Sequence, residues 1–334
     1  MTILVTGGAG FIGSHLCERL IASGRRVIVL DNFDPFYDPA LKRANLGALF
    51  GHEAFQLVEA DIRNLPGMEA ALAPLGSIDV VVHLAARAGV RPSIEEPLAY
   101  THTNVAGTAA VLELARRLDV RRLVFGSSSS VYGNNVQIPF SEADPVDQPI
   151  SPYAATKRAG ELLCHTYHHL YAMSIVCLRF FTVYGPRQRP DLAIHKFARL
   201  MAAGEPIPMY GDGSTERDYT YIDDILQGIE SAIRYTERES PVFEIVNLGE
   251  SRTTSLRRLV DLIGGALGIE PVIRHLPLQP GDVSRTYADV RRARELLGYE
   301  PGIPVEEGIP RFAEWFRTAG RTEEDRRQKI GDRR

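Results

Sequence analysis

The chain has 334 residues, of which 44% are hydrophobic and 24% charged, and its formal net charge is −4. These values are typical of a globular protein of about two domains. The chain has no excess of positive charge, so nucleic acids and anionic membranes are not expected as partners. The three cysteines are far apart and form no CxxC pair, so neither a disulfide framework nor a zinc site is expected.

No run of 18 apolar residues occurs, and the first strand begins at Thr2 without a charged leader. We therefore expect no membrane span, no signal peptide and a cytoplasmic location. The nine histidines lack the spacing of metal ligands, so we also expect no bound metal.

A strand, a glycine turn and a helix follow one another in residues 3–16, which read ILVTGGAGFIGSHL. The glycines allow the backbone to turn tightly and to approach a pyrophosphate, which the helix N-terminus would bind. A second strand at residues 26–30 ends at Asp31, where a carboxylate would bind the adenosine ribose and repel a 2′-phosphate. The whole unit predicts an NAD site, although a glycine cluster alone is often an ordinary turn.

Further strands are expected at residues 55–60, 78–84, 122–125 and 174–180, with helices at residues 97–118 and from Pro152 onwards. This alternation predicts an α/β fold with a doubly wound parallel sheet, and the ligand at the carboxyl ends of its strands. The predicted NAD contacts are Gly7, Gly10, Phe11, Ile12, Gly13, Asp31, Asn32, Asp61, Ile62, Leu84, Ala85, Ala86, Tyr153 and Lys157.

Beyond residue 181 the alternation loosens into proline- and glycine-rich sequence, which predicts a smaller, irregular lobe. We expect an NAD-binding domain at residues 1–180, to which a segment near residues 215–249 returns, and a substrate lobe at residues 181–320. The charged residues 322–334 are expected to be disordered. The loop after Asp31, NFDPFYDPALKRANL, is either a surface connection or a lid over the bound molecules.

Tyr153 and Lys157 are four residues apart on one predicted helix, so they share a face. An ammonium group near a phenol lowers the phenol's pKa from about 10, which would allow the phenol to accept a hydroxyl proton. By itself, such a pair is more often part of an ordinary polar helix surface.

The motifs TGGAGFIG, HLAA, SSSSVYG and SPYAATK, together with Asp31, resemble the extended short-chain dehydrogenase/reductase family, specifically its nucleotide-sugar epimerases and dehydratases. The resemblance extends to about Tyr299. It implies a Rossmann fold, NAD as cofactor, and a catalytic triad of Ser128, Tyr153 and Lys157. It also implies a homodimer formed through the helices near residues 97–118 and 152–172.

Ser129 and Ser130 stand where the dehydratases of this family carry Asp and Glu. Serine is too weak an acid and base to protonate a leaving hydroxyl or to take a proton from carbon. The departure favours oxidation and re-reduction at C4 of the sugar, which is the chemistry of a 4-epimerase.

The segment from Arg179, RFFTVYGPRQRPDLA, resembles the part of the family that leads into the sugar pocket. Arg87, Thr182 and Arg189 together resemble the UDP-glucuronate 4-epimerase subgroup, in which an arginine fork would suit the C6 carboxylate. Taken singly, each arginine is equally consistent with a surface charge. Gln279 stands where some members carry a second phosphate-binding arginine. The predicted substrate contacts are Arg87, Ser127, Ser128, Ser129, Thr182, Arg189, Lys196, Arg217 and Asp282.

The sequence thus favours NAD-dependent epimerisation of UDP-glucuronate to UDP-galacturonate through a 4-keto intermediate. One alternative is a 4-epimerase of a neutral UDP-sugar such as UDP-glucose or UDP-galactose. In that case Arg87 and Arg189 would have no carboxylate to bind. Another is a catalytically silent NAD-binding regulator, which an intact Ser128, Tyr153 and Lys157 disfavours. The choice between UDP and dTDP stays open.

Overall fold

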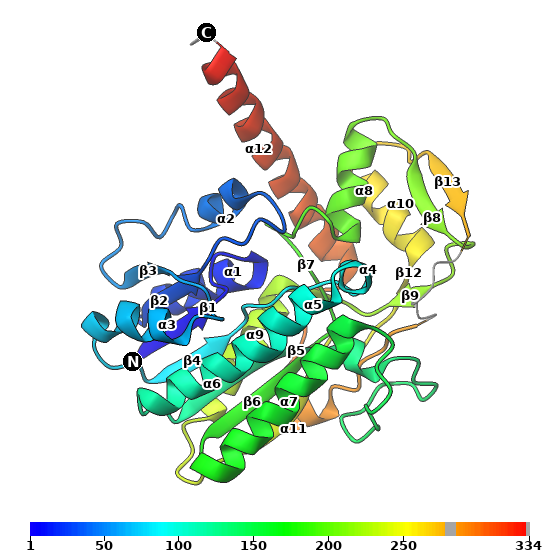
Figure 1. The fold of residues 1–334 in the computed structure, drawn as a ribbon. Coiled ribbons are helices and arrows are strands. Elements are labelled where there is room, and N and C mark those ends of the chain that lie inside the picture. The colour runs from blue at the N-terminus through cyan, green and yellow to red at the C-terminus, as the bar shows by residue number, and fades with distance from the viewer. Residues whose placement is uncertain (278–284, 332–334) are drawn as a thin grey trace.

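The structure, a computed structural model, describes residues 1–277 and 285–331. A seven-stranded sheet in the order β11-β6-β5-β4-β1-β2-β3 forms its centre, and all of its strand pairs are parallel (Figure 1). This is the doubly wound Rossmann arrangement that the alternation predicted. The strands are β1 (Thr2–Thr6), β2 (Arg26–Asp31), β3 (Phe55–Glu59), β4 (Val80–His83), β5 (Arg122–Ser128), β6 (Ser174–Phe180) and β11 (Phe243–Leu248).

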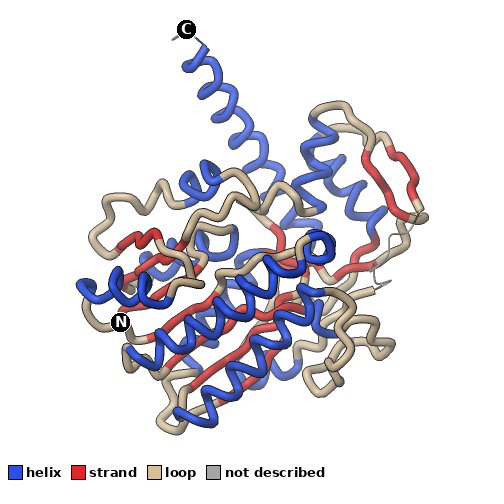
Figure 2. Tube along the Cα trace, in the orientation of Figure 1, coloured by secondary structure: helices blue, strands red, loops and turns tan. Residues whose placement is uncertain are grey.

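Helices cover both faces of this sheet (Figure 2). The strand residues alternate between the two resulting cores: Ile3 and Val5 pack into one, and Leu4 packs into the other. Burial on both faces explains why these strands are continuous apolar runs. The helices of this part are α1 (Phe11–Ala22), α2 (Pro39–Asn45), α3 (Leu65–Leu72), α4 (Val90–Glu95), α5 (Pro97–Tyr100), α6 (Gly107–Arg117), α7 (Pro152–Tyr171), α9 (Ile222–Tyr235) and α11 (Arg291–Leu297).

The helix expected at residues 97–118 is interrupted, because Thr101–Ala106 is a π-helix between α5 and α6. The buried Asn104 in this segment accepts a hydrogen bond from the Arg87 backbone N–H at 2.8 Å. Its amide nitrogen donates to the Arg87 carbonyl at 2.9 Å and to the Thr156 hydroxyl at 3.0 Å. Through Asn104, the π-helix thus connects the segment after β4 to α7 by hydrogen bonds. Such π-helical segments are frequent at functional sites.

The smaller lobe consists of short elements in three two-stranded sheets, β10-β7, β12-β9 and β13-β8, with helices packed beside them. The buried Asp218 lies between its strands and accepts hydrogen bonds from the backbone N–H groups of Glu250, Ser251 and Ala288. The elements are β7 (Thr182–Tyr184), α8 (Ala193–Ala202), β8 (Ile207–Tyr210), β9 (Glu216–Arg217), β10 (Tyr219–Tyr221), β12 (Thr254–Ser255), α10 (Leu256–Leu267), β13 (Ile273–Leu276) and α12 (Val305–Gly331).

Helix α12 extends away from the rest of the molecule and runs to Gly331 (Figure 1). Its backbone is therefore helical over residues 322–331, and the disorder expected for residues 322–334 stays a prediction. Among the described helices, none combines the length and apolar content needed to cross a bilayer.

Candidate active site

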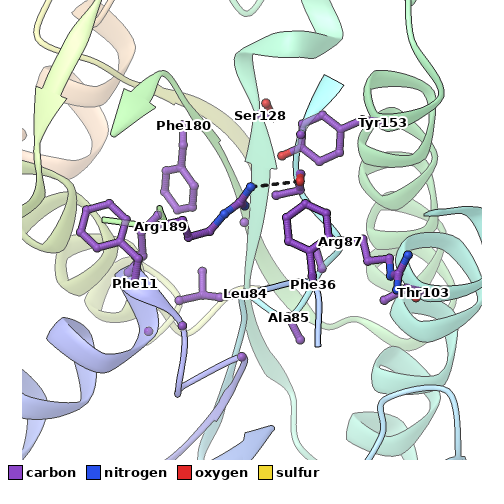
Figure 3. A pocket seen from close by; sticks show the side chains of 18 of the residues that line it. Phe11, Phe36, Leu84, Ala85, Arg87, Thr103, Ser128, Tyr153, Phe180 and Arg189 are labelled. Atoms are coloured by element: carbon purple, nitrogen blue, oxygen red, sulfur yellow. Dashed lines mark hydrogen bonds between the residues drawn. The ribbon is translucent and has the colours of Figure 1, made fainter. Parts of the chain in front are cut away.

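A cavity of about 470 Å³ opens at the carboxyl ends of the central strands (Figure 3). Gly7 lines it just after β1, Asp31 at the end of β2, Leu84 after β4 and Ser128 at the end of β5. Segments of the smaller lobe, including Thr182 of β7, close the other side. The cavity therefore lies where a parallel α/β sheet places its ligands.

The glycine turn between β1 and α1 brings the backbone close to one end of the cavity. Gly7 has a φ of +71°, and a Cβ atom on Gly13 would lie 2.3 Å from the Gly7 carbonyl oxygen. Helix α1 begins after Gly10 with no side chain capping its first turn. Its backbone N–H groups are thus available to an anion, as a dinucleotide pyrophosphate requires.

Asp31 is buried at the same end of the cavity, with 7% of its surface exposed. Its carboxylate accepts hydrogen bonds from the backbone N–H groups of Ala9 at 3.1 Å and Phe33 at 2.8 Å. Burial raises the pKa of Asp31, while these two hydrogen bonds and the nearby Lys42 ammonium oppose the shift. The carboxylate is therefore fixed in position where an adenosine ribose would lie.

Lys157 lies below the middle of the cavity, where its Nζ donates a hydrogen bond to the Gly126 carbonyl at 2.7 Å. Burial lowers the pKa of Lys157 to about 8. Burial raises the pKa of Tyr153, and the effects of Ser128 and Arg189 oppose that rise. The Lys157 ammonium binds the Gly126 carbonyl and lies 6.0 Å from the centre of the Tyr153 ring, and the lowering of the Tyr153 pKa by Lys157 stays a prediction.

Two of the four serines have distinct bonding partners. The Ser128 hydroxyl donates to the Ser130 hydroxyl at 3.0 Å and accepts from the Ser130 backbone N–H at 3.2 Å. The Ser127 hydroxyl donates to Glu161 at 2.6 Å, and Glu161 also pairs with the buried Arg179 at 2.9 Å. Ser127 is therefore oriented by this interior ion pair, and its contact with the substrate stays a prediction.

Arg189 reaches into the middle of the cavity, towards Tyr153 (Figure 3). Its Nε and Nη2 donate to the two carboxylate oxygens of Asp191 at 3.0 and 2.6 Å, and Nη2 also donates to the Ala88 carbonyl at 3.2 Å. Within the described part of the chain, Nη1 of Arg189 has no hydrogen-bond acceptor. Arg87 also lines the cavity, where it pairs with Glu96 and, at 3.5 Å, with Asp34.

Comparison with known proteins places these features in a family. Residues 3–249 match the model of the NAD dependent epimerase/dehydratase family. The chain belongs to this family. A probable UDP-glucuronate 4-epimerase of Rhizobium meliloti (strain 1021) is 41% identical over 332 residues, which cover 95% of this chain and 97% of that protein.

Two solved epimerase structures resemble the chain as a whole. A UDP-glucuronic acid 4-epimerase of Bacillus cereus, in complex with UDP-glucuronic acid and NAD, has a TM-score of 0.87 and 36% identity, covering 96% of this chain and 100% of that one. A UDP-glucose 4-epimerase of Thermotoga maritima, with UDP-glucose, has a TM-score of 0.85 and 35% identity, covering 96% and 99%. Overall shape therefore does not separate epimerases of acidic and neutral sugars.

Most of the residues predicted to form this epimerase-family site do line one cavity. The NAD contacts among them are Gly7, Gly10, Phe11, Ile12, Gly13, Asp31, Asn32, Ile62, Leu84, Ala85, Ala86, Tyr153 and Lys157. The substrate contacts among them are Arg87, Ser127, Ser128, Ser129, Thr182 and Arg189.

Three of the predicted contacts do not line it. Asp61 pairs instead with Arg63 at 2.6 Å, and the hydrogen bonds from Arg63 lower the pKa of Asp61 to about 2. Lys196 on α8 and Arg217 on β9 belong to the smaller lobe, outside this part of the cavity wall. Asp282 and Gln279 lie outside the described residues.

The cavity wall also contains residues that the sequence did not single out. They include residues of the loop after β2, of α2, of the π-helix, of the end of β6 and of β7: Asp34, Phe36, Tyr37, Lys42, Thr103, Phe180 and Val183. The aromatic residues of the loop were the available signal, because exposed aromatics in a long loop indicate a binding role.

Proposed function

We propose that the protein is an NAD-dependent UDP-glucuronate 4-epimerase that interconverts UDP-glucuronate and UDP-galacturonate through a 4-keto intermediate. The observation that carries this proposal is the position of Arg189, which enters the same cavity as Tyr153, Ser128 and Lys157. A guanidinium with one nitrogen still available suits the carboxylate at C6 of the sugar.

The glycine turn fits NAD, because α1 begins after Gly10 with uncapped backbone N–H groups that suit a pyrophosphate. Cβ atoms on Gly7 or Gly13 would lie 2.7 and 2.3 Å from backbone atoms of the chain, so only glycine permits this close turn. Gly10 and Gly13 would hold the pyrophosphate, Asp31 the adenosine ribose, and Lys157 the nicotinamide ribose. NAD supplies the hydride acceptor and donor for C4.

In this mechanism Tyr153 accepts the proton from O4 as C4 is oxidised, and returns it when C4 is reduced from the other face of the sugar. Burial raises the pKa of Tyr153 and therefore works against the phenolate, whereas the charge of Arg189 works in its favour. Ser128, whose hydroxyl already bonds to Ser130, orients O4. Serines at 129 and 130 provide no carboxylic acid, so elimination of water does not follow oxidation.

The 4-keto intermediate of a uronic acid is a β-keto acid, which loses carbon dioxide once its carboxylate can align with the carbonyl. An epimerase of this substrate must therefore keep the carboxylate fixed until C4 is reduced. Charge-assisted hydrogen bonds from Arg189, aided by Arg87 and Thr182, would fix its plane and stabilise its charge.

One observation favours the rival reading, a 4-epimerase of a neutral UDP-sugar. Arg189 is already paired with Asp191, and Arg87 with Glu96 and Asp34. Both arginines could then serve only the architecture of the cavity wall. In that case a hydroxymethyl group would occupy the place of the carboxylate.

The decisive experiment incubates the purified protein with UDP-glucuronate and with UDP-glucose in separate reactions. Proton NMR of the products then detects the C4 epimer of each sugar. Faster formation of UDP-galacturonate supports the proposal, and exclusive formation of UDP-galactose supports the neutral-sugar reading. A protein that binds NAD but converts neither sugar would be the silent regulator.

A homodimer and a cytoplasmic location are further parts of the proposal. Three leucines on the outer surfaces of α5 and α7 are exposed by more than half: Leu98 (81%), Leu162 (53%) and Leu170 (60%). Pairing of these helices between two copies would remove this apolar surface from water. Light scattering of the double variant Leu162→Glu, Leu170→Glu would then show a monomer.

The cytoplasmic location is tested by cell fractionation.

A further inference from the structure

The loop between β2 and α2 forms a wall of the cavity, and the mechanism above gives it no role. Asp34, Phe36 and Tyr37 of this loop line the cavity, and the Phe36 ring is half-buried there. The loop has a defined shape: Asp31 binds the Phe33 backbone N–H at 2.8 Å, and the buried Lys42 ammonium donates to the Asp34 carbonyl at 2.7 Å. It therefore extends from the predicted adenosine site to the predicted sugar site.

This loop contacts both of the arginines that line the cavity. The Asp34 carboxylate lies 3.5 Å from Nη2 of Arg87. The Phe36 ring lies against the guanidinium of Arg189, whose central carbon is 5.1 Å from the ring centre. Figure 3 shows the Phe36 ring beside the end of the Arg189 side chain, on the side towards Arg87.

The surroundings of Arg189 restrain it in two ways. Asp191 and the Ala88 carbonyl hold two of its nitrogens, which sets the rotation of the guanidinium in its own plane. The ring of Phe36 covers a face and resists tilting of that plane. A cation held against an aromatic face also loses part of its hydration, which strengthens its hydrogen bonds to an anion.

We propose that Phe36 is a specificity-determining positioning residue, whose ring holds the Arg189 guanidinium in the plane that receives the carboxylate of a uronic-acid sugar. Phe36 acts through Arg189 and not on the reacting atoms. The inference rests on the proposed function, because it assigns Arg189 to the C6 carboxylate. It extends that function by naming a residue far away in sequence that sets the choice between acidic and neutral sugars.

The test compares Phe36→Ala, Phe36→Leu and Phe36→Tyr with the wild type on UDP-glucuronate and UDP-glucose. Phe50→Ala is the matched control, because Phe50 is 51% exposed and does not line the cavity. We expect Phe36→Ala to lower kcat/KM for UDP-glucuronate about tenfold, mainly through KM, which is the scale of one cation–π contact. Activity on UDP-glucose should change much less, and the share of turnovers ending in a 4-keto pentose should rise.

Phe36→Tyr keeps the aromatic face and should behave like the wild type, whereas Phe36→Leu keeps only apolar bulk and should resemble Phe36→Ala. Equal losses on both sugars, no loss on either, or full activity of Phe36→Leu would each overturn the inference. The conservative variants keep the test valid if Phe36→Ala does not fold. A wild type that converts only UDP-glucose would instead reject the proposed function, so the two failures are distinguishable.

Discussion

The two ends of the cavity are lined by different kinds of chemical groups. At the end formed by the β1–α1 turn, the backbone dominates: Gly7 and Gly13 permit a close turn, and α1 presents uncapped N–H groups. At the other end, the polar wall consists of charged side chains, Arg87 and Arg189, each already paired with a carboxylate. The backbone of the turn suits the pyrophosphate that all dinucleotides share, whereas the side chains of the ion-paired wall can be changed one at a time.

This contrast indicates where specificity can vary within one fold. Substitution at Gly13 would place a Cβ atom 2.3 Å from the Gly7 carbonyl oxygen, so the cofactor end tolerates little change. The sugar end depends on Arg189, whose guanidinium is contacted by the side chains of Asp191 and Phe36. The following variants test the two ends separately.

The largest effect is expected at Tyr153, where the two ends meet. Tyr153→Phe should still bind NAD but lose activity by about 10²–10⁴-fold, because the general base for O4 is removed. Initial rates with UDP-glucuronate and fluorescence titration with NAD measure the two quantities. Tyr171→Phe, at the far end of the same helix, should leave both unchanged. Near-normal turnover of Tyr153→Phe would remove this residue from the mechanism.

A change confined to the sugar end is expected for Arg189→Ala. It should weaken UDP-glucuronate binding by about 2–5 kcal/mol if the substrate carboxylate is left buried without its partner. It should also raise the share of turnovers that end in a 4-keto pentose, with a much smaller change for UDP-glucose. Steady-state kinetics and product NMR measure these changes, with the exposed Arg199→Ala as control. Equal losses in kcat/KM for both sugars would make Arg189 structural.

A change confined to the cofactor end is expected for Asp31→Ala. The wild type should bind NAD far better than NADP, because a 2′-phosphate would meet the Asp31 carboxylate. Loss of charged hydrogen bonds to the ribose should weaken NAD binding by about 10–100-fold and narrow the difference between the cofactors. Calorimetry measures both affinities. Asp61→Ala should change neither, since Asp61 pairs with Arg63 and does not line the cavity.

The smallest effect concerns stability in acid at the cofactor end. His83 is buried between the hydroxyls of Thr6 at 2.7 Å and Thr108 at 3.0 Å, and burial lowers its pKa to about 3. Between that value and about 6.5, the unfolded chain binds one more proton than the folded chain. This residue should therefore cost about 1.4 kcal/mol of stability for each unit by which the pH falls through that window.

Urea unfolding at several pH values between 6 and 4 tests this expectation. His83→Gln should show a shallower loss of stability with falling pH than the wild type, and the exposed His52→Gln should show the wild-type slope. Equal slopes for all three proteins would mean that His83 does not titrate on unfolding.

The cofactor end could be predicted from the sequence because its determinants are local. Strand, glycine turn, helix and Asp31 lie within one short stretch, and each has its own signature. The contact of Phe36 with Arg189 could not be predicted in the same way. Phe36 contacts Arg189 only because the folded sheet places the end of β2 close to the smaller lobe. A contact of this kind produces no periodic pattern in the sequence.

Other sequence predictions differ from the structure where one local sequence pattern is compatible with two structures. Asp61 follows a strand as a ribose or adenine contact would, yet Arg63 lies two residues away and pairs with it. Residues 97–118 have a helical pattern, and only the buried contacts of Asn104 select the π-helical turn. The division into an NAD domain of residues 1–180 and a substrate lobe of residues 181–320 stays a prediction.

The pairing of β11 with β6 has a consequence for how the chain is made. Val246 and Leu248 complete the central sheet, although β7 to β10 of the smaller lobe precede them in sequence. During synthesis β6 is an unpaired edge strand until residue 248 has emerged, and its apolar faces are exposed to aggregation meanwhile. A fragment that stops at Phe180 should therefore be insoluble. The sequence between β6 and β11 includes α9, whose Ile225 and Ile229 pack into the core of the sheet, so this segment also supplies part of the sheet's cover.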